Sequence, residues 1–376
     1  MLALCGLAAG AACGADEVAD NTPSLTESVV WKFPTGKSID AVPVVEDSVL
    51  YCGSMDGVFY AIDAVSGREL WRFASPQPIN SRAALAPDLV CFESGNTLYG
   101  LDRKTGAEKW HYAASEQPPV LSLGLTDYHH SSPVLHEGVA YFGDGWGNLM
   151  GVDLRTGRPV FQYTTETKQA IRSAPAIADG VIYFGDWEGD VYAVTLATRE
   201  LRWKFRQENA RPYYGAVVSP MVVRKGVLYF GSQHDILTPL DVATGKPVWR
   251  YEDPKHTYLP STPVFHGDRM IVASTIWTLS VFCFGPSGEI VWQCPTDGIG
   301  FVTPVVKDSV LVINSSNFGK AGSLSFINVD TGALLSRVPI GRASSSSPVI
   351  VGDRLFIGCG DGAIYALDYP ALLKAP

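Results

Sequence analysis

The sequence is poor in charge, and no stretch of it concentrates positive residues. Charged residues make up 18% of the 376 residues, and the formal net charge is −9. Nucleic-acid binding requires Lys and Arg clustered on one face, and electrostatic docking on anionic lipid requires the same. The composition therefore excludes both as partners. The hydrophobic content of 46% excludes disorder and supplies a large core.

Motifs of catalysis and metal binding are also missing. The sequence has no nucleophile elbow, no phosphate-binding loop and no His-Glu helix motif. His129 and His130 are adjacent, and neighbouring residues of a strand point to opposite sides, so both rarely bind one ion. Asp144 and Asp186 each follow a glycine in a turn, where a carboxylate caps the backbone. We therefore predict no catalytic residue and no metal site.

The N-terminus is typical of an export signal. Residues 1–15 are apolar and small but too few to span a membrane, and no later run is long and apolar enough to do so. Cys13 opens a small-x-small cleavage site and also closes a loose lipobox, so a free protein and one lipidated on Cys13 both stay open. We expect a signal peptide at 1–15, a flexible linker at 16–28 and one domain at 29–376. The predicted location is the periplasm, free or anchored to the outer membrane.

The cysteines of the mature chain do not suggest a disulfide framework. Five remain after residue 15, which is an odd number. We predict that they are buried apolar thiols: Cys52, Cys91, Cys283, Cys294 and Cys359.

One pattern recurs through the chain with a period in the forties, and each copy predicts four short strands joined by tight turns. A proline marks the first strand of most copies, with Ala84 in its place in copy two: Pro43, Pro133, Pro175, Pro220, Pro263, Pro304 and Pro348. An aromatic residue marks the fourth strand: Trp31, Trp71, Trp110, Phe161, Trp203, Trp249 and Trp292. Ser336 replaces this aromatic in copy seven. The turn before the fourth strand, which ends in Thr-Gly in several copies, is altered in copy four at Thr195–Arg199.

The last copy predicts how the repeat closes. It ends at Asp368 without its fourth strand, and an unattached strand of that type stands at residues 29–33. Pairing these segments closes a ring and leaves no open sheet edge. The prediction is an all-β, eight-bladed β-propeller of four-stranded antiparallel blades, whose last blade is closed by the N-terminal strand.

The repeat resembles a known family. Ser-x-Pro, Tyr-Phe-Gly, Asp-Gly, Tyr-Ala-Leu-Asp, Thr-Gly and the tryptophan together look like the pyrroloquinoline-quinone-like (PQQ-like) propeller repeat, over residues 29–368. This resemblance implies that each aromatic of the fourth strand docks against the next blade. The repeat occurs in quinoprotein dehydrogenases and in non-enzymatic outer-membrane assembly proteins of the BamB type, and the chain resembles the second group more.

Propeller geometry places the inter-blade connections and the loops between second and third strands on one face, which we call the loop face. Its unusual residues are the candidate binding residues: His129, His130, Trp146, Arg172, Trp187, Tyr213, Tyr214, His234, Tyr258 and Trp277. The three tryptophans among them lie outside the docking series, and the fold does not require them. Exposed aromatics gathered on one face are typical of a binding surface.

Three functions follow as hypotheses. The first is a non-catalytic scaffold without cofactor, a monomer within a complex, whose resemblance to BamB-type proteins implies envelope partners such as the outer-membrane assembly machinery. The second is a quinoprotein oxidoreductase holding PQQ with calcium. The resemblance to that group implies a vicinal disulfide and a calcium site, and the sequence has no Cys-Cys pair and no insertion rich enough for the calcium site. The third is a glycan-binding propeller that stacks sugars on the tryptophans.

Overall fold

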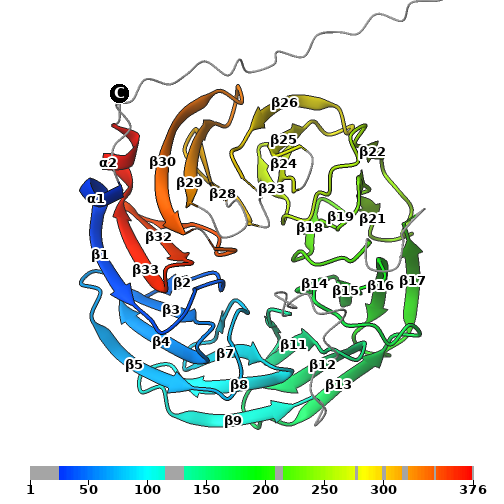
Figure 1. The fold of residues 1–376 in the computed structure, drawn as a ribbon. Coiled ribbons are helices and arrows are strands. Elements are labelled where there is room, and N and C mark those ends of the chain that lie inside the picture. The colour runs from blue at the N-terminus through cyan, green and yellow to red at the C-terminus, as the bar shows by residue number, and fades with distance from the viewer. Residues whose placement is uncertain are drawn as a thin grey trace, which may run out of the picture.

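The structure is a computed structural model that describes residues 25–114, 131–207, 215–275, 278–298, 302–315, 321–342 and 344–374. These residues form eight blades around a central axis, which confirms the predicted fold (Figure 1). Two short helices, α1 (Leu25–Ser28) and α2 (Tyr369–Leu373), lie together beside blade eight. Helix α1 occupies the end of the segment predicted as a linker. No helix in these ranges is long and apolar enough to cross a membrane.

Blades one to four are regular four-stranded antiparallel sheets. Blade one contains β2 (Val44–Glu46), β3 (Val49–Gly53), β4 (Val58–Asp63) and β5 (Glu69–Ala74). Blade two contains β6 (Ala84–Leu85), β7 (Leu89–Ser94), β8 (Thr97–Asp102) and β9 (Glu108–Ala113). Blade three contains β10 (Val134–His136), β11 (Val139–Gly143), β12 (Asn148–Asp153) and β13 (Pro159–Thr164). Blade four contains β14 (Ala176–Ala178), β15 (Val181–Gly185), β16 (Asp190–Thr195) and β17 (Leu201–Arg206).

Blades six to eight repeat this plan, and blade five departs from it. Blade five contains β18 (Val222–Arg224), β19 (Val227–Tyr229), β20 (Ile236–Leu237), β21 (Leu240–Asp241) and β22 (Tyr251–Glu252). Blade six contains β23 (Val264–His266), β24 (Arg269–Ala273), β25 (Ser280–Phe284) and β26 (Ile290–Pro295). Blade seven contains β27 (Val305–Lys307), β28 (Val310–Ser315), β29 (Ala321–Asn328) and β30 (Leu334–Arg342). Blade eight contains β1 (Val29–Pro34), β31 (Val349–Val351), β32 (Arg354–Cys359) and β33 (Ala363–Asp368).

The core lies between blades rather than within one. The second and third strands are buried almost throughout, because a neighbouring sheet covers each of their faces. The fourth strands alternate: in β5, Trp71 is buried while Leu70 and Arg72 are exposed. Across the first interface, the rings of Phe59 and Phe92 stack with their centroids 4.2 Å apart. Each blade therefore depends on its neighbours for its apolar contacts.

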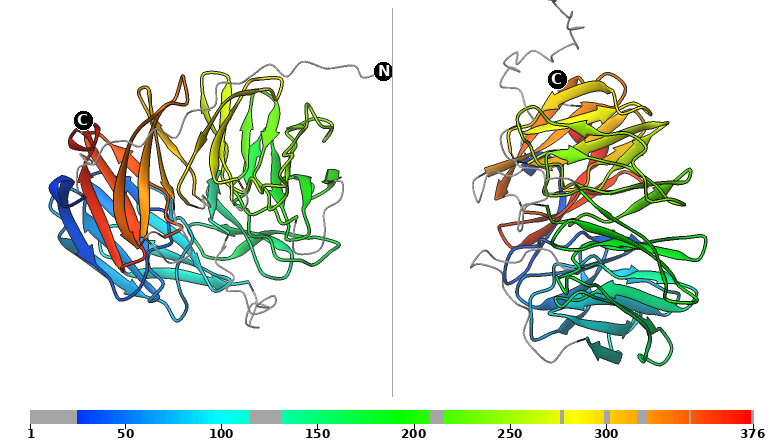
Figure 2. Two further views of the ribbon diagram at one scale, coloured as in Figure 1. Left: turned by 45° about the horizontal axis from the view of Figure 1, so that its top comes forward. Right: turned by 90° about the vertical axis from the view of Figure 1, so that its right-hand side faces the viewer.

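Ring closure takes place as the sequence predicts. Strand β1, drawn in blue, lies beside β33, drawn in red, and the two strands pair antiparallel (Figure 1, Figure 2). In this pairing Trp31 lies opposite Ala366, and Phe33 lies opposite Ile364. Just beyond the strand, Thr35 N–H donates to Gly362 O at 2.7 Å. The first and last strands of the chain thus share one sheet, and the outermost strand of blade eight comes from the N-terminus.

The aromatic residues of the fourth strands dock each blade on the next, which confirms the implication of the repeat. Trp71 is 8% exposed, and its Nε1 donates to Arg103 O in the following blade at 3.0 Å. A turn glycine with positive φ lies against each tryptophan ring; a Cβ on Gly106 (φ +71) would stand 2.5 Å from Trp71 Cε3. The same glycine contact recurs at five further tryptophans: Trp31, Trp110, Trp203, Trp249 and Trp292.

Each of the two irregular positions in this series is matched by a change in the next blade. Arg199 stands where the turn glycine is expected, with φ +62, and the aromatic facing it is the smaller Phe161, 5.9 Å from the guanidinium. Ser336 needs no ring, because blade eight has helix α2 in place of the turn. Tyr369 and Leu372 of that helix are buried in the core between blades seven and eight.

A buried serine explains the Ser-x-Pro motif. Ser173 Oγ accepts the N–H of Gly185 at 2.9 Å and donates to its carbonyl at 3.0 Å, which ties the blade entrance to the second strand. In six blades such a serine, which we call the clamp serine, accepts the N–H of the residue twelve positions later: Ser81, Ser131, Ser173, Ser219, Ser261 and Ser346. The clamp corrects two predicted positions, because Ala83 rather than Ala84, and Met221 rather than Pro220, directly precede the first strands.

Blade five is split at Pro239. Its third strand is interrupted, so β21 pairs with β19 while β20 pairs separately with β22. Proline has no N–H to give to a ladder and is disfavoured in a central strand. Its carbonyl still accepts from Val248 N at 2.9 Å, which keeps the outer segment in place.

Candidate functional site

The loop face is built from paired segments. In each of three blades, a backbone N–H of the loop between second and third strands donates to a carbonyl of the preceding inter-blade connection: Met55 to Ser38, Trp187 to Ala170 and Gln233 to Ala216, at 2.9–3.0 Å. These bonds join the two kinds of loop into one surface. The arrangement confirms that both emerge on the same face.

Trp146 lies at the tip of the loop in blade three. Asp144 Oδ1 accepts the N–H groups of Trp146 and Asn148, both at 2.8 Å, which is the turn capping that the sequence predicts. The residue is half-buried. Its Nε1 is buried and has no hydrogen-bond partner in the described part of the chain. Solvent therefore reaches Trp146 through its other atoms.

Trp187 lies in the corresponding loop of blade four, one position earlier in the turn. Asp186 Oδ1 accepts from the backbone N–H groups of Glu188 and Asp190, both at 3.0 Å, so this loop is capped in the same way. Trp187 is also half-buried, and its Nε1 likewise lacks a partner among the residues described. Two adjacent blades thus each present a tryptophan on a loop held by a carboxylate cap.

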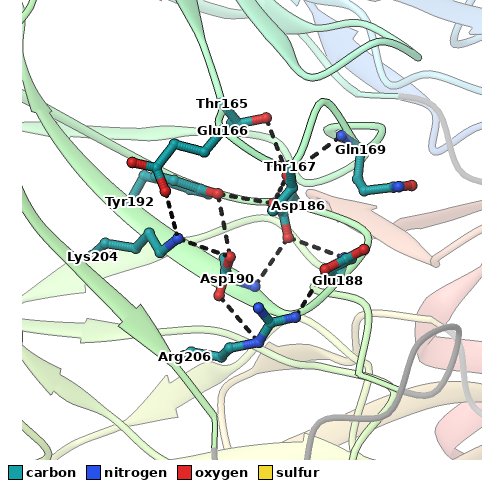
Figure 3. Close-up of polar contacts among 10 residues, drawn as sticks. All are labelled: Thr165, Glu166, Thr167, Gln169, Asp186, Glu188, Asp190, Tyr192, Lys204 and Arg206. Carbon is teal, nitrogen blue, oxygen red and sulfur yellow. Dashed lines mark hydrogen bonds and ion pairs between the residues drawn. The ribbon is translucent and has the colours of Figure 1, made fainter.

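A buried polar network supports the Trp187 loop (Figure 3). Asp186 and Asp190 are both 0% exposed. Asp186 Oδ2 accepts from Thr167 Oγ1 of the inter-blade connection at 2.7 Å and from the Tyr192 hydroxyl at 3.0 Å. Burial raises the pKa of Asp186, and the negative charge of Asp190 adds to this effect. The network ties the connection before blade four to the loop that carries Trp187.

Two cations complete the network at the outer strand β17. Lys204 Nζ lies 3.3 Å from Asp190 Oδ2 and 3.2 Å from Glu166, and Arg206 pairs with Glu188 at 2.9 Å (Figure 3). Every carboxylate in the group has a cation or a hydroxyl beside it. The arrangement holds the loops in place.

Arg172 and His234, predicted as binding residues of this face, are 2% and 6% exposed and so lie inside the protein. Arg172 packs beside Gly145, where a Cβ would meet its Nη2 at 3.5 Å. His234 Nδ1 lies 2.8 Å from Asp235 Oδ1. Both side chains therefore lie within the protein rather than on the surface of the loop face.

One contact could not be read from the sequence. Asp235 also meets His256 Nδ1, at 2.5 Å, so a single carboxylate joins two histidines of blade five. This hydrogen bond raises the pKa of His256, which is exposed. Nearby, Tyr258 is half-buried, and its carbonyl accepts from Thr275 N at 2.9 Å. The remaining candidates lie outside the described residues: Cys13, His129, His130, Tyr213, Tyr214 and Trp277.

The chemistry of the described side chains is limited. Within the ranges given above, no group of three His, Cys, Asp or Glu side chains is placed to hold a metal ion. The five cysteines are free and buried, as predicted. Burial raises the pKa of Cys283 to about 11 and those of Cys91 and Cys359 to about 12, which keeps these thiols protonated and unreactive.

Solved structures share this propeller fold. A BamB from Moraxella catarrhalis superposes with a TM-score of 0.64 and 18% identity, over 91% of this chain and 88% of that one. A quinohemoprotein alcohol dehydrogenase from Comamonas testosteroni gives a TM-score of 0.70 at 14% identity, over 90% and 76% of the two chains. Such identities show the fold and do not distinguish the two functions.

Sequence comparison does distinguish the family. A curated outer membrane protein assembly factor BamB from Xanthomonas campestris pv. campestris is 26% identical over 159 residues. That match covers 40% of this chain and only 37% of the relative. The family model described as "Outer membrane protein assembly factor BamB" matches residues 17–251 and 167–282, which together span more than half of the chain. The chain therefore belongs to the BamB family of PQQ-like β-propellers.

Proposed function

We propose that this chain is a non-catalytic scaffold of the cell envelope, whose loop face docks a protein of the outer-membrane assembly machinery. Family membership carries the proposal, because the matching model and the curated relative are both described as outer membrane protein assembly factors. The loop face supplies a surface suited to the task. Its tryptophans are the residue type that most often anchors protein interfaces.

The loops that carry these tryptophans are held by hydrogen bonds, which favours a preorganised surface for binding the partner protein. Trp187 stands on a loop held by Asp186 and by the network around Asp190, and Trp146 stands on a loop capped by Asp144. Groups that are already fixed lose little conformational entropy when a partner binds. We propose that both indoles contact the partner as rigid apolar anchors, with Tyr258 as a further contact.

The experiment compares matched variants on the two faces. The chain, tagged at its C-terminus, is expressed in the bacterium that encodes it, and the co-purified assembly subunits are quantified by mass spectrometry. The Trp146→Ala/Trp187→Ala double variant should lose most of them. Val65→Ala, at a 72% exposed position of a turn on the opposite face, should retain them. Equal recovery with both variants would refute the loop face as the docking surface.

The same material tests the location. We propose that the protein is exported to the periplasm and acts as a monomer within the complex, with either a free N-terminus or a lipid anchor on Cys13. Mass spectrometry of the mature N-terminus separates these forms, since acylation of Cys13 adds the mass of a lipid. A chain that still begins at Met1 would contradict export.

We further propose that the scaffold works without a cofactor. The sequence has neither a Cys-Cys pair nor a Cys-x-x-Cys-His motif. Titration with PQQ and calcium should leave the cofactor's absorbance unchanged and produce no dye reduction with alcohols. A stoichiometric spectral shift would favour the oxidoreductase alternative. Binding to a glycan array that the double tryptophan variant loses would favour the sugar-binding alternative.

A further inference from the structure

The blades enclose a cavity on the propeller axis. Its volume is about 740 Å³, and the first strands of the blades and the residues before them line it. One residue of each blade, directly after the clamp position, faces this cavity. We call these eight residues the axial ring: Val42, Arg82, Ser132, Ala174, Pro220, Thr262, Thr303 and Ser347. The volume lies in the range typical of small-molecule sites.

Arg82 is the one charged member of the axial ring. Its backbone N–H donates to Ser132 Oγ of the next blade at 2.9 Å, which fixes its position. Its side chain forms no ion pair or hydrogen bond with any other residue that the structure describes, and it is exposed to the cavity. The protein that surrounds the cavity lowers the pKa of its guanidinium. Because the guanidinium has no partner among the described residues, its N–H groups are free to donate to an anion bound in the cavity.

Neither of the two carboxylates that line the cavity forms an ion pair with Arg82. Asp40 and Glu46 are the other charged residues among those that line it. Glu46 accepts from Arg103 Nη1 at 2.9 Å. Asp40 accepts from Ser38 Oγ at 3.2 Å and from Ser345 N at 3.3 Å. Neither acid pairs with Arg82: Glu46 has Arg103 as its partner, and Asp40 is held by hydrogen bonds from two neutral groups.

The other ring members define what the guanidinium would bind. Four are hydroxyl residues, and two of these hydroxyls accept backbone N–H groups, Ser132 Oγ from Arg82 and Ser347 Oγ from Thr303. A hydroxyl that accepts such a bond still has its own proton to donate. The remaining three members are apolar. A guanidinium with hydroxyl donors and an apolar wall suits an oxyanion on a small carbon skeleton.

We propose that the axial cavity is a binding site for a small organic oxyanion, with a carboxylate or phosphate group held by Arg82 and the ring hydroxyls. The site is independent of the loop face, since it rests on different residues. It would give the scaffold a ligand that bridges blades around the axis.

The test is isothermal titration of the purified chain with citrate and with glycerol 3-phosphate, which separate the carboxylate source from the phosphate source. At least one should bind saturably with a stoichiometry of one. Arg82→Gln should weaken that binding roughly tenfold or more, as expected for a lost charge-assisted hydrogen-bond pair. Arg68→Gln, the same change on an exposed turn, should leave binding unaltered.

Two controls keep the outcome interpretable. Circular dichroism and thermal unfolding of Arg82→Gln without ligand should match the wild type, since the arginine side chain has no hydrogen bond or ion pair with a described residue to lose. The variant should also still recover the assembly subunits, which separates this site from the proposed docking face. No saturable binding by either anion, or equal binding by Arg82→Gln, would overturn the proposal.

Discussion

The tryptophans of this chain fall into two groups with opposite environments. The docking tryptophans of the fourth strands are mostly buried, lie on a glycine of the next blade, and in five cases donate Nε1 to a carbonyl there at 2.8–3.1 Å. Trp146 and Trp187 are half-buried and have no such partner in the described structure. The same residue type therefore docks one blade on the next in the fourth strands and lies partly exposed in the loops of blades three and four.

The largest effect should come from removing a docking ring. Trp71→Ala should lower the free energy of unfolding by about 3–5 kcal/mol, because it opens a cavity and removes the shorter of the two hydrogen bonds to Arg103 O. Urea denaturation followed by far-UV circular dichroism measures this loss. Trp71→Phe should cost less, since it keeps part of the ring. Wild-type stability in the Ala variant would mean that docking does not depend on this residue.

An exchange at the irregular interface should have an intermediate effect. Phe161→Trp alone should destabilise the protein by about 1–3 kcal/mol, since Arg199 occupies the space that a turn glycine leaves elsewhere. Adding Arg199→Gly should recover most of this loss. A double-mutant cycle on unfolding free energies measures the coupling. Strict additivity would show that Phe161 and Arg199 do not compensate for each other.

The loop-face tryptophans should contribute less to stability than the docking ones. Trp187→Ala should lower the unfolding free energy by about 1 kcal/mol, because the ring covers little core and has no hydrogen bond to lose. The same denaturation experiment as for Trp71 measures the difference. Losses of equal size at Trp187 and Trp71 would break the comparison between the two groups.

The pH dependence of the network in blade four follows from the raised pKa of Asp186. A carboxyl whose pKa is raised by folding binds its proton more tightly in the folded state. Its contribution is fully present below the ordinary value of 3.8 and is lost as pH rises through the folded-state pKa. As the pH increases from below 3.8 to above the folded-state pKa of Asp186, Asp186→Asn should therefore lose less unfolding free energy than the wild type. Parallel pH curves of unfolding free energy would contradict the raised pKa.

The smallest effect on stability should come from removing the contact between Asp235 and His256. Hydrogen bonding to Asp235 raises the pKa of His256 above its ordinary 6.5, so the stabilisation from this contact is present below 6.5 and lost as pH rises through the folded value. An NMR titration of the imidazole should show that pKa falling in Asp235→Asn. An unchanged titration midpoint would show that the carboxylate does not act on His256.

Much of the fold is readable from the sequence because the repeat is local. A turn glycine or a fourth-strand aromatic can be recognised within a single copy. The unattached strand at residues 29–33 can be recognised because it has the pattern of a fourth strand. The functional site is harder to read. Arg172 and His234 look like surface residues in a loop, and only the tertiary structure shows that they are buried. The split at Pro239 is similar, because the proline is visible in the sequence while the rearranged pairing depends on both neighbouring strands.

The sequence by itself determined the number of blades and the closure of the ring, since these follow from short-range periodicity and turn chemistry. The docking role of the tryptophans was implied by the resemblance to the PQQ-like repeat. Only the tertiary structure decided which polar groups meet: Asp186 with Thr167, Asp235 with His256, and Arg82 alone on the axis. The physical reason is that these encounters join residues from different blades or from separate segments of one blade. Their distances depend on how the ring closes, and no pattern along the chain records them.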